Sequence, residues 1–135
     1  MTTTPTTLGI DHLGLTVEDL MLSLSFFTDC LGWSQFGGNP DYPSAYITDG
    51  SSKLTLWQAK TDSPIAFDRH QNIGLHHLAL KVESKEALSR LFERVKNWPG
   101  VTVEFAPEFS GKGPKIHCMV LEPGGNRLEL SFDPR

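Results

Sequence analysis

Several features that would restrict the class of this 135-residue protein are scarce or missing from its sequence. Its two cysteines, Cys30 and Cys118, form neither a CxxC pair nor a disulfide framework, so we expect buried free thiols in a reducing, cytoplasmic setting. We expect no signal peptide, and no apolar run is long enough to cross a bilayer. The net charge of −4 leaves no basic stripe, which argues against nucleic acid and membranes as partners.

What is present fits one globular domain over residues 8–135. Hydrophobic residues make up 39% of the chain and charged residues 21%, enough to bury a core without disulfide or metal support. A metal ion in such a domain would therefore serve function.

Two stretches of the sequence are nearly the same: HLGLTVE at residues 12–18 and HLALKVE at residues 77–83. Each predicts a strand that leads into an amphipathic helix. Three further strands are expected after each helix, which gives an α+β fold of two tandem βαβββ modules, residues 8–59 and 75–133. The connector between them, residues 60–74, is longer than an ordinary loop and is expected to form a crossover or a lid.

The boundaries of these elements follow from alternation, helical spacing and turn residues. In the first module we expect a strand, a helix and three strands at residues 10–17, 19–31, 33–36, 45–48 and 53–57. In the second, a strand is expected at residues 75–82, a helix capped by Ser84 that ends at Pro99-Gly100, and strands at residues 101–105, 116–121 and 127–132.

The repeated histidines are the first candidates for chemistry. His12 and His77 open equivalent strands, on the face opposite the leucines, and neutral imidazole is the commonest protein metal ligand. On the last strand, Glu129 alternates with core leucines and is expected on the same polar side. Two imidazoles and one carboxylate would hold a divalent cation and leave positions open for substrate oxygens. These three residues are the predicted metal ligands.

Other histidines have simpler interpretations. His76 should face the side of the sheet opposite His77, and His70 should be a solvated loop residue. His117 and Met119 share one strand face and line the cavity, unless the strand parity is reversed and they belong to the core or the surface.

The paired modules, the His-Leu-x-Leu-x-Val openings and the closing EPGGNRLE at residues 122–129 resemble the vicinal oxygen chelate superfamily. This group includes glyoxalase I, methylmalonyl-CoA epimerase, extradiol dioxygenases, fosfomycin-resistance transferases and bleomycin-binding proteins. The resemblance implies U-shaped mixed sheets around a metal-binding cavity. It also implies a homodimer, with modules paired within a chain or exchanged between chains.

The superfamily's ligand places are the first and fourth strands of each module. By resemblance they fall on His12, His77 and Glu129, with a divalent metal (Fe, Mn, Ni, Zn or Co) as the cofactor. The remaining place falls on Thr55, where glyoxalase I carries a glutamate that is both ligand and base. A threonine hydroxyl does not titrate near neutral pH, which argues against ordinary glyoxalase I activity.

The three-ligand subgroups also differ from this chain. An extradiol dioxygenase would have an acid-base tyrosine at Met119, although His117 offers a proton-handling group on that face. The fosfomycin transferases have a threonine at Gly14, a tyrosine at Met119 and a basic residue beyond the last strand, where this sequence ends at Arg135.

Two classes of function therefore stay open. The first is a metal-dependent enzyme acting on a small oxygen-chelating molecule by lyase, isomerase, transferase or dioxygenase chemistry. Glu129 and His117 would be its catalytic residues. Its substrate cavity would contain Thr55, Trp57, Met119 and Arg127. The second is a protein of the bleomycin-resistance type that sequesters an aromatic molecule in a groove lined by Trp33, Phe36, Tyr46 or Trp57. A third possibility is a degenerate protein that keeps the metal ligands but has lost its activity.

Overall fold

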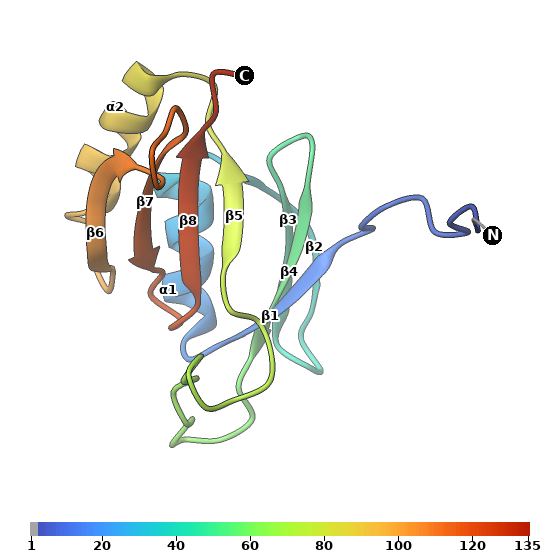
Figure 1. The fold of residues 1–135 in the computed structure, drawn as a ribbon. Coiled ribbons are helices and arrows are strands. Elements are labelled where there is room, and N and C mark those ends of the chain that lie inside the picture. Colours follow the sequence, from blue (N-terminus) through green and yellow to red (C-terminus); the bar gives the residue numbers. More distant parts are fainter. Residues whose placement is uncertain (1–2) are drawn as a thin grey trace.

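The computed structural model describes residues 3–135 and contains two βαβββ modules in tandem (Figure 1). The first module consists of β1 (Leu13–Val17), α1 (Leu20–Ser25) with a following π-helical turn (Phe26–Cys30), β2 (Ser34–Asn39), β3 (Ser44–Thr48) and β4 (Lys53–Gln58). The second consists of β5 (Leu78–Lys81), α2 (Lys85–Val95), β6 (Thr102–Phe109), β7 (Ile116–Leu121) and β8 (Arg127–Phe132). The predicted α+β class and tandem modules are confirmed.

Each module forms one four-stranded mixed sheet. The strand orders are β1-β4-β3-β2 and β5-β8-β7-β6, so the same topology occurs twice. In both sheets the first strand runs parallel to the fourth and the other pairs are antiparallel. Equivalent leucines are in register, because Leu13 pairs with Leu54 and Leu78 pairs with Leu128.

Each helix begins after a capping side chain, Asp19 before α1 and the predicted cap Ser84 before α2. The Asp19 carboxylate accepts hydrogen bonds from two backbone N–H groups of α1, and Ser84 caps α2 through the N–H of Ala87. The first helix differs from the prediction, because residues 26–30 continue it as a π-helical turn rather than an α-helix. The wider turn puts Phe26, Phe27 and Cys30 all in the core.

Both opening strands are shorter than predicted at their N-terminal ends. The expected strands at residues 10–17 and 75–82 are observed as Leu13–Val17 and Leu78–Lys81. Pairing between β1 and β4 begins at Leu13 and Leu54, and residues 3–12 have no β-pairing partner in the described part of the chain. The two repeated histidines therefore lie just before their strands rather than within them.

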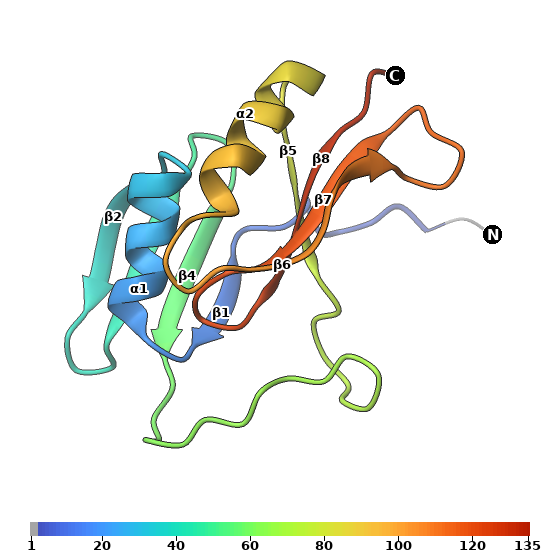
Figure 2. The same ribbon diagram turned by 90° about the vertical axis from the view of Figure 1, so that its left-hand side faces the viewer.

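The two helices lie between the two sheets, as Figure 2 shows from the side. One continuous core joins Leu15 and Leu56 of the first sheet, the helices, and Leu128 and Leu130 of the second. The helix-packed faces of the sheets therefore face each other. Their other faces, here called the outer faces, point away from each other on opposite sides of the chain.

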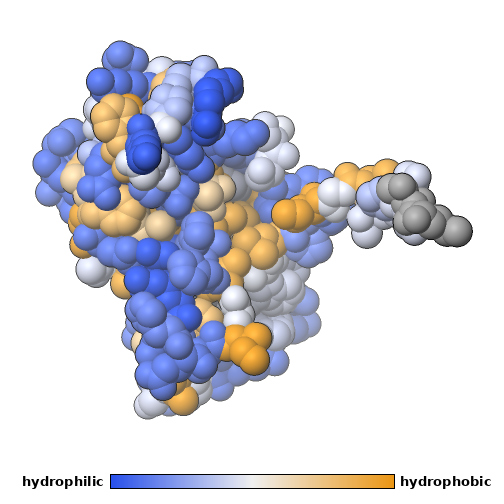
Figure 3. Space-filling view, in the orientation of Figure 1, coloured by the Kyte–Doolittle hydropathy of each residue, from blue (hydrophilic) through white to orange (hydrophobic). Residues whose placement is uncertain are grey.

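Two segments lie outside this packed body. Residues 3–12 form an arm that extends from β1, with exposed apolar side chains that include Leu8 and Ile10 (Figure 3). The connector, residues 60–74, runs as a loop between β4 and β5 (Figure 2). Among the described residues, no helix is both long and apolar enough to traverse a bilayer.

Candidate functional site

Glu129 is the centre of a polar cluster on the outer face of the second sheet. It pairs with Ala79 on β5 and Met119 on β7, and its side chain is 10% exposed. One carboxylate oxygen lies 3.6 Å from His77 Nε2 and 3.4 Å from His117 Nδ1. The other lies 3.6 Å from Lys115 Nζ. The structure thus brings together Glu129, His77 and His117, all of them predicted site residues.

The spacing of His77 and Glu129 fits two ligands of one ion. Donors about 2.1 Å from a tetrahedral metal lie about 3.4 Å from each other, and the observed N···O distance is 3.6 Å. His117 Nδ1 is buried and has no hydrogen-bond partner within residues 3–135. A buried polar atom without a partner beside a carboxylate is a feature that a bound ion or polar ligand would satisfy.

His12 lies elsewhere. Its exposed imidazole is 2.6 Å from the carboxylate of Asp11, at the start of the first sheet. The fold explains the separation, because His12 precedes β1 and His77 precedes β5, on modules whose outer faces point apart. Across residues 3–135, the structure contains no group of three or more His, Cys, Asp or Glu side chains arranged to hold a metal. Within one chain, the predicted ligand His12 therefore lies apart from His77 and Glu129.

The position of His76 differs from the prediction. It was expected on the opposite side of the sheet, yet its Nδ1 lies 2.8 Å from His77 Nδ1. The reason is that both residues precede β5, so strand alternation does not apply to them. The Nη1 of Arg127 lies 3.3 Å from the same His76 nitrogen, and Arg127 also pairs with Glu104.

The outer face of the first sheet is aromatic. The ring centroid of Trp57 lies 4.9 Å from that of Tyr42 and 5.9 Å from that of Tyr46. The indole N–H of Trp57 donates a 2.8 Å hydrogen bond to Thr55, and Lys60 Nζ lies 3.9 Å above the Tyr42 ring. This face offers a flat apolar wall rather than ionisable ligands.

Trp33 does not belong to this wall. The sequence suggested it as a groove residue, but it is buried in the core, edge-on to Phe27. Both cysteines are buried free thiols, as predicted. Burial raises the pKa of Cys30, and it raises the pKa of Cys118 to about 11, so neither is a thiolate nucleophile at neutral pH.

Three charged residues near the cluster were not among the predicted site residues. Lys115 stands two positions before His117, so strand alternation alone would have placed it on the same face. Arg69 lies in the connector, and Glu104 lies at an irregularity in the β6–β7 pairing between Val103 and Phe105. Neither of these last two carries a local sequence signal that links it to the site.

Comparison with known proteins agrees with the architecture. A family model described as the Glyoxalase/Bleomycin resistance protein/Dioxygenase superfamily matches residues 9–130. No curated protein matches the sequence.

Solved structures share the fold at low identity. A glyoxylase/bleomycin resistance protein/dioxygenase domain from Frankia sp. EAN1pec is 24% identical with a TM-score of 0.80, covering 96% of this chain and 95% of that one. A glyoxalase-related enzyme from Fulvimarina pelagi is 21% identical with a TM-score of 0.75, covering 95% and 90%. A lactoylglutathione lyase from Agrobacterium tumefaciens is 20% identical with a TM-score of 0.70, covering 95% and 96%.

The repeated βαβββ modules, the strand order and the family match over residues 9–130 lead to one assignment. This chain belongs to the Glyoxalase/Bleomycin resistance protein/Dioxygenase superfamily.

Proposed function

We propose that this protein is a divalent-metal-dependent enzyme that acts on a small oxygen-chelating substrate, with each metal site shared between two chains. His77 and Glu129 of one chain would hold the ion together with His12 of a second copy. The observation that carries the proposal is the 3.6 Å contact between His77 and Glu129 on an outer face. His12 is exposed on the other module and free to meet a partner.

A second copy of the chain would cover the outer faces of both sheets. The outer face of the second sheet carries a cluster of ionisable groups, and the outer face of the first carries the aromatic wall. Neither face has a covering layer among residues 3–135. Because the helices occupy the space between the two sheets, these faces meet only across chains. A symmetric dimer would place the aromatic wall of one chain over the Glu129 cluster of the other, twice.

Each side chain has a role in this arrangement. A bound divalent ion would polarise substrate oxygens and stabilise a developing anion. Glu129 lies on the interior strand β8, and the His117 imidazole 3.4 Å from it would hold a substrate oxygen or move a proton. Met119 supplies an apolar surface next to Glu129, and Thr55 and Trp57 would face it from the partner.

We expect metal to copurify with the protein when no chelator is used. Alanine at His12, His77 or Glu129 should each lower metal content at least tenfold, since loss of one of three ligands removes much of the binding energy. The measurement is metal analysis per chain, with circular dichroism to verify folding. His70→Ala is the matched control, because His70 is an exposed connector histidine. Full metal content in His77→Ala would refute the assignment.

Mixing two variants tests the sharing of sites between chains. His12→Ala and Glu129→Ala chains, unfolded together and refolded in equal amounts, should form half heterodimers, each with one intact site out of two. About a quarter of the wild-type metal content should therefore return, although neither variant binds metal alone. Sites built within one chain would give no recovery, because every chain lacks one ligand.

The same proposal requires a dimer. Sedimentation equilibrium at micromolar concentration should give a mass near twice the 15.0 kDa of one chain. A mass that stays at the single-chain value across this concentration range would contradict it.

The aromatic wall supports a second candidate, which is capture of a flat aromatic molecule without catalysis. Such a ligand would stack on Trp57 beside Tyr42 and Tyr46. Binding of this kind would persist in Glu129→Ala and be lost in Trp57→Leu, whereas catalysis through the metal would be lost in Glu129→Ala.

A further inference from the structure

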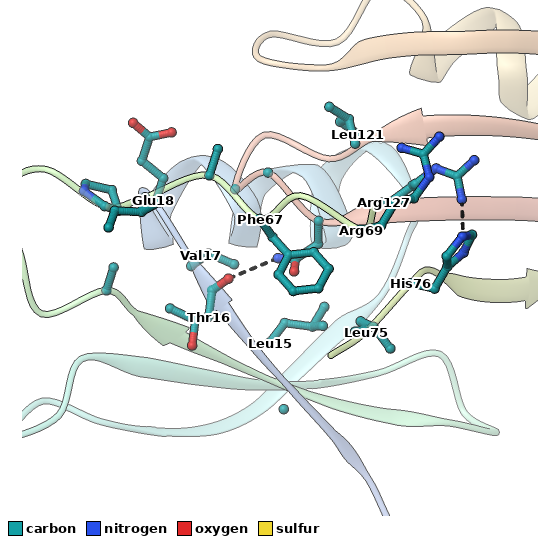
Figure 4. A pocket seen from close by; sticks show the side chains of 18 of the residues that line it. Leu15, Thr16, Val17, Glu18, Phe67, Arg69, Leu75, His76, Leu121 and Arg127 are labelled. Carbon is teal, nitrogen blue, oxygen red and sulfur yellow. Dashed lines mark hydrogen bonds between the residues drawn. The ribbon is translucent and has the colours of Figure 1, made fainter. Parts of the chain in front are cut away.

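A pocket of about 510 Å³ lies at the junction of the two modules (Figure 4), and Glu129, His77 and His117 are not among the residues that line it. Its walls come from β1, the connector, the segment before β5 and the turn that leads into β8. This volume is within the usual range for small-molecule sites, and most of the lining is apolar with a few polar groups at one end. We call it the junction pocket.

At its polar end the junction pocket contains two guanidinium groups, of Arg69 and Arg127, and one carboxylate, of Glu104. Arg127 donates to Glu104 through Nε at 2.9 Å and Nη2 at 2.5 Å, and its Nη1 reaches His76. Arg69 Nη2 lies 3.9 Å from the same carboxylate, too far for a hydrogen bond. Within the described part of the chain, Arg69 makes no hydrogen bond at all, so its planar set of donors is available.

The charges at this end add up to an excess of one positive charge. The hydrogen bonds from Arg127 lower the pKa of Glu104, which therefore stays ionised and neutralises one arginine. Glu18 also lines the pocket, but at the other end, and its carboxylate points away from the arginines (Figure 4). The whole chain has a net charge of −4, but this end of the pocket is locally positive and would favour an anion.

The rest of the pocket suits an apolar body. Figure 4 shows the Phe67 ring in its middle, with Leu15 and Leu75 below the ring and Leu121 above it. Phe67 packs closely on the connector, because a Cβ atom placed on Gly74 would lie 3.0 Å from its ring. A planar or short aliphatic group entering the pocket would therefore meet the aromatic face of Phe67, which is 49% exposed.

We propose that the junction pocket binds a small organic carboxylate, with its anionic end on Arg69 and Arg127 and its apolar body against Phe67. The pocket adjoins the candidate metal ligands, since Arg127 is two residues from Glu129 on one strand face and His76 contacts His77. That this carboxylate belongs to the substrate of the metal site rests on the function proposed above. The binding itself does not.

Benzoate and its neutral analogue benzamide are the probes. We expect benzoate to bind the purified full-length protein in calorimetric titration, at least tenfold more tightly than benzamide and more weakly as salt is raised. The titrations are repeated with Glu129→Ala, which lacks the proposed metal site, so that a benzoate bound to metal is not mistaken for one bound in the pocket. Binding retained in Glu129→Ala supports the proposal whether or not the wild-type protein holds metal.

Four variants locate the site. Arg69→Met and Arg127→Met should each weaken benzoate about tenfold, and Glu104→Gln should tighten it, because it removes the competing carboxylate. Arg90→Met, on the exposed surface of α2 and outside the pocket, should have no effect. Equal affinity for benzoate and benzamide would overturn the proposal. So would benzoate binding that Arg69→Met and Glu104→Gln leave unchanged.

Discussion

Glu122→Ala is expected to lower the free energy of unfolding by about 4 kcal/mol, one of the largest effects of any single substitution in this chain. The carboxylate is 1% exposed and accepts four hydrogen bonds. Ser23 Oγ and the N–H of Gly124 donate to one oxygen at 2.7 Å each, and Asn126 donates to the other through both its backbone N–H and its side chain at 2.9 Å. Alanine would remove the acceptor of the buried Ser23 hydroxyl and of the part-buried donors of Gly124 and Asn126.

This carboxylate also joins the two modules. Ser23 lies on α1 of the first module, whereas Glu122 and Asn126 begin and end the β7–β8 turn of the second. The Asn126 side chain additionally donates to the backbone carbonyl of Thr16, at 3.0 Å. Loss of Glu122 should therefore loosen the docking of one module on the other as well as the turn itself.

Chemical denaturation monitored by tryptophan fluorescence measures the effect. Glu122→Gln keeps one acceptor oxygen and should lose about half as much stability, and Ser23→Ala, which removes a single donor, should lose about 1 kcal/mol. Glu86→Ala, on the exposed first turn of α2, controls for the loss of a carboxylate. If Glu122→Ala unfolded at the same denaturant concentration as the control, the hydrogen bonds to this residue would be of no consequence to stability.

The surroundings of Glu122 include one feature that the sequence predicts, the turn, and one that it does not, the contact with α1. Residues 122–126 were expected as a turn between two strands, and both strands, Ile116–Leu121 and Arg127–Phe132, have the predicted bounds. Alternating apolar residues and turn residues are local signals, so the sequence alone predicts the strands and the turn. The bonding of Glu122 to Ser23 spans 99 positions along the chain and depends on how α1 packs against the turn. No local pattern encodes that contact.

The candidate site also has one feature that the sequence predicts and one that it does not. The position of Glu129 on the outer face follows from strand alternation with Leu128 and Leu130, which the sequence displays. The separation of His12 from His77 follows instead from the helices lying between the two sheets. The sequence shows that both histidines open equivalent strands, but equivalence within a repeat does not say which faces of two modules meet.

The second large effect concerns glyoxalase chemistry: the unmodified protein should have negligible activity on the methylglyoxal-glutathione hemithioacetal, even when supplied with Ni²⁺ or Zn²⁺. That reaction removes a proton next to a carbonyl, so it needs a carboxylate base over that carbon in addition to a cation on the oxygens. By resemblance to glyoxalase I, Thr55 occupies the place of the base. Its hydroxyl does not titrate near neutral pH, and it already accepts a hydrogen bond from Trp57.

Thr55→Glu tests the same argument in the opposite direction. Thr55 lies on the central strand β4, paired with Gly14 on one side and Tyr46 on the other. A Cβ atom placed on Gly14 would lie 3.3 Å from the indole nitrogen of Trp57, so a longer side chain at position 55 must displace that indole to extend over the outer face. Glutamate there would add the missing fourth ligand and base, and should raise hemithioacetal turnover by at least two orders of magnitude if the metal site forms as proposed.

Thr55→Gln is the matched control, because it has nearly the same size and no basic carboxylate. It should stay inactive while Thr55→Glu gains activity, which separates the chemistry of the carboxylate from any change in shape. Activity in both variants would mean that position 55 acts by packing. Turnover of about 10 per second or more by the unmodified protein would show that another group, such as Glu129 released from the metal, already removes the proton. Thr55 would then have no bearing on the reaction, and glyoxalase I activity would become the leading assignment.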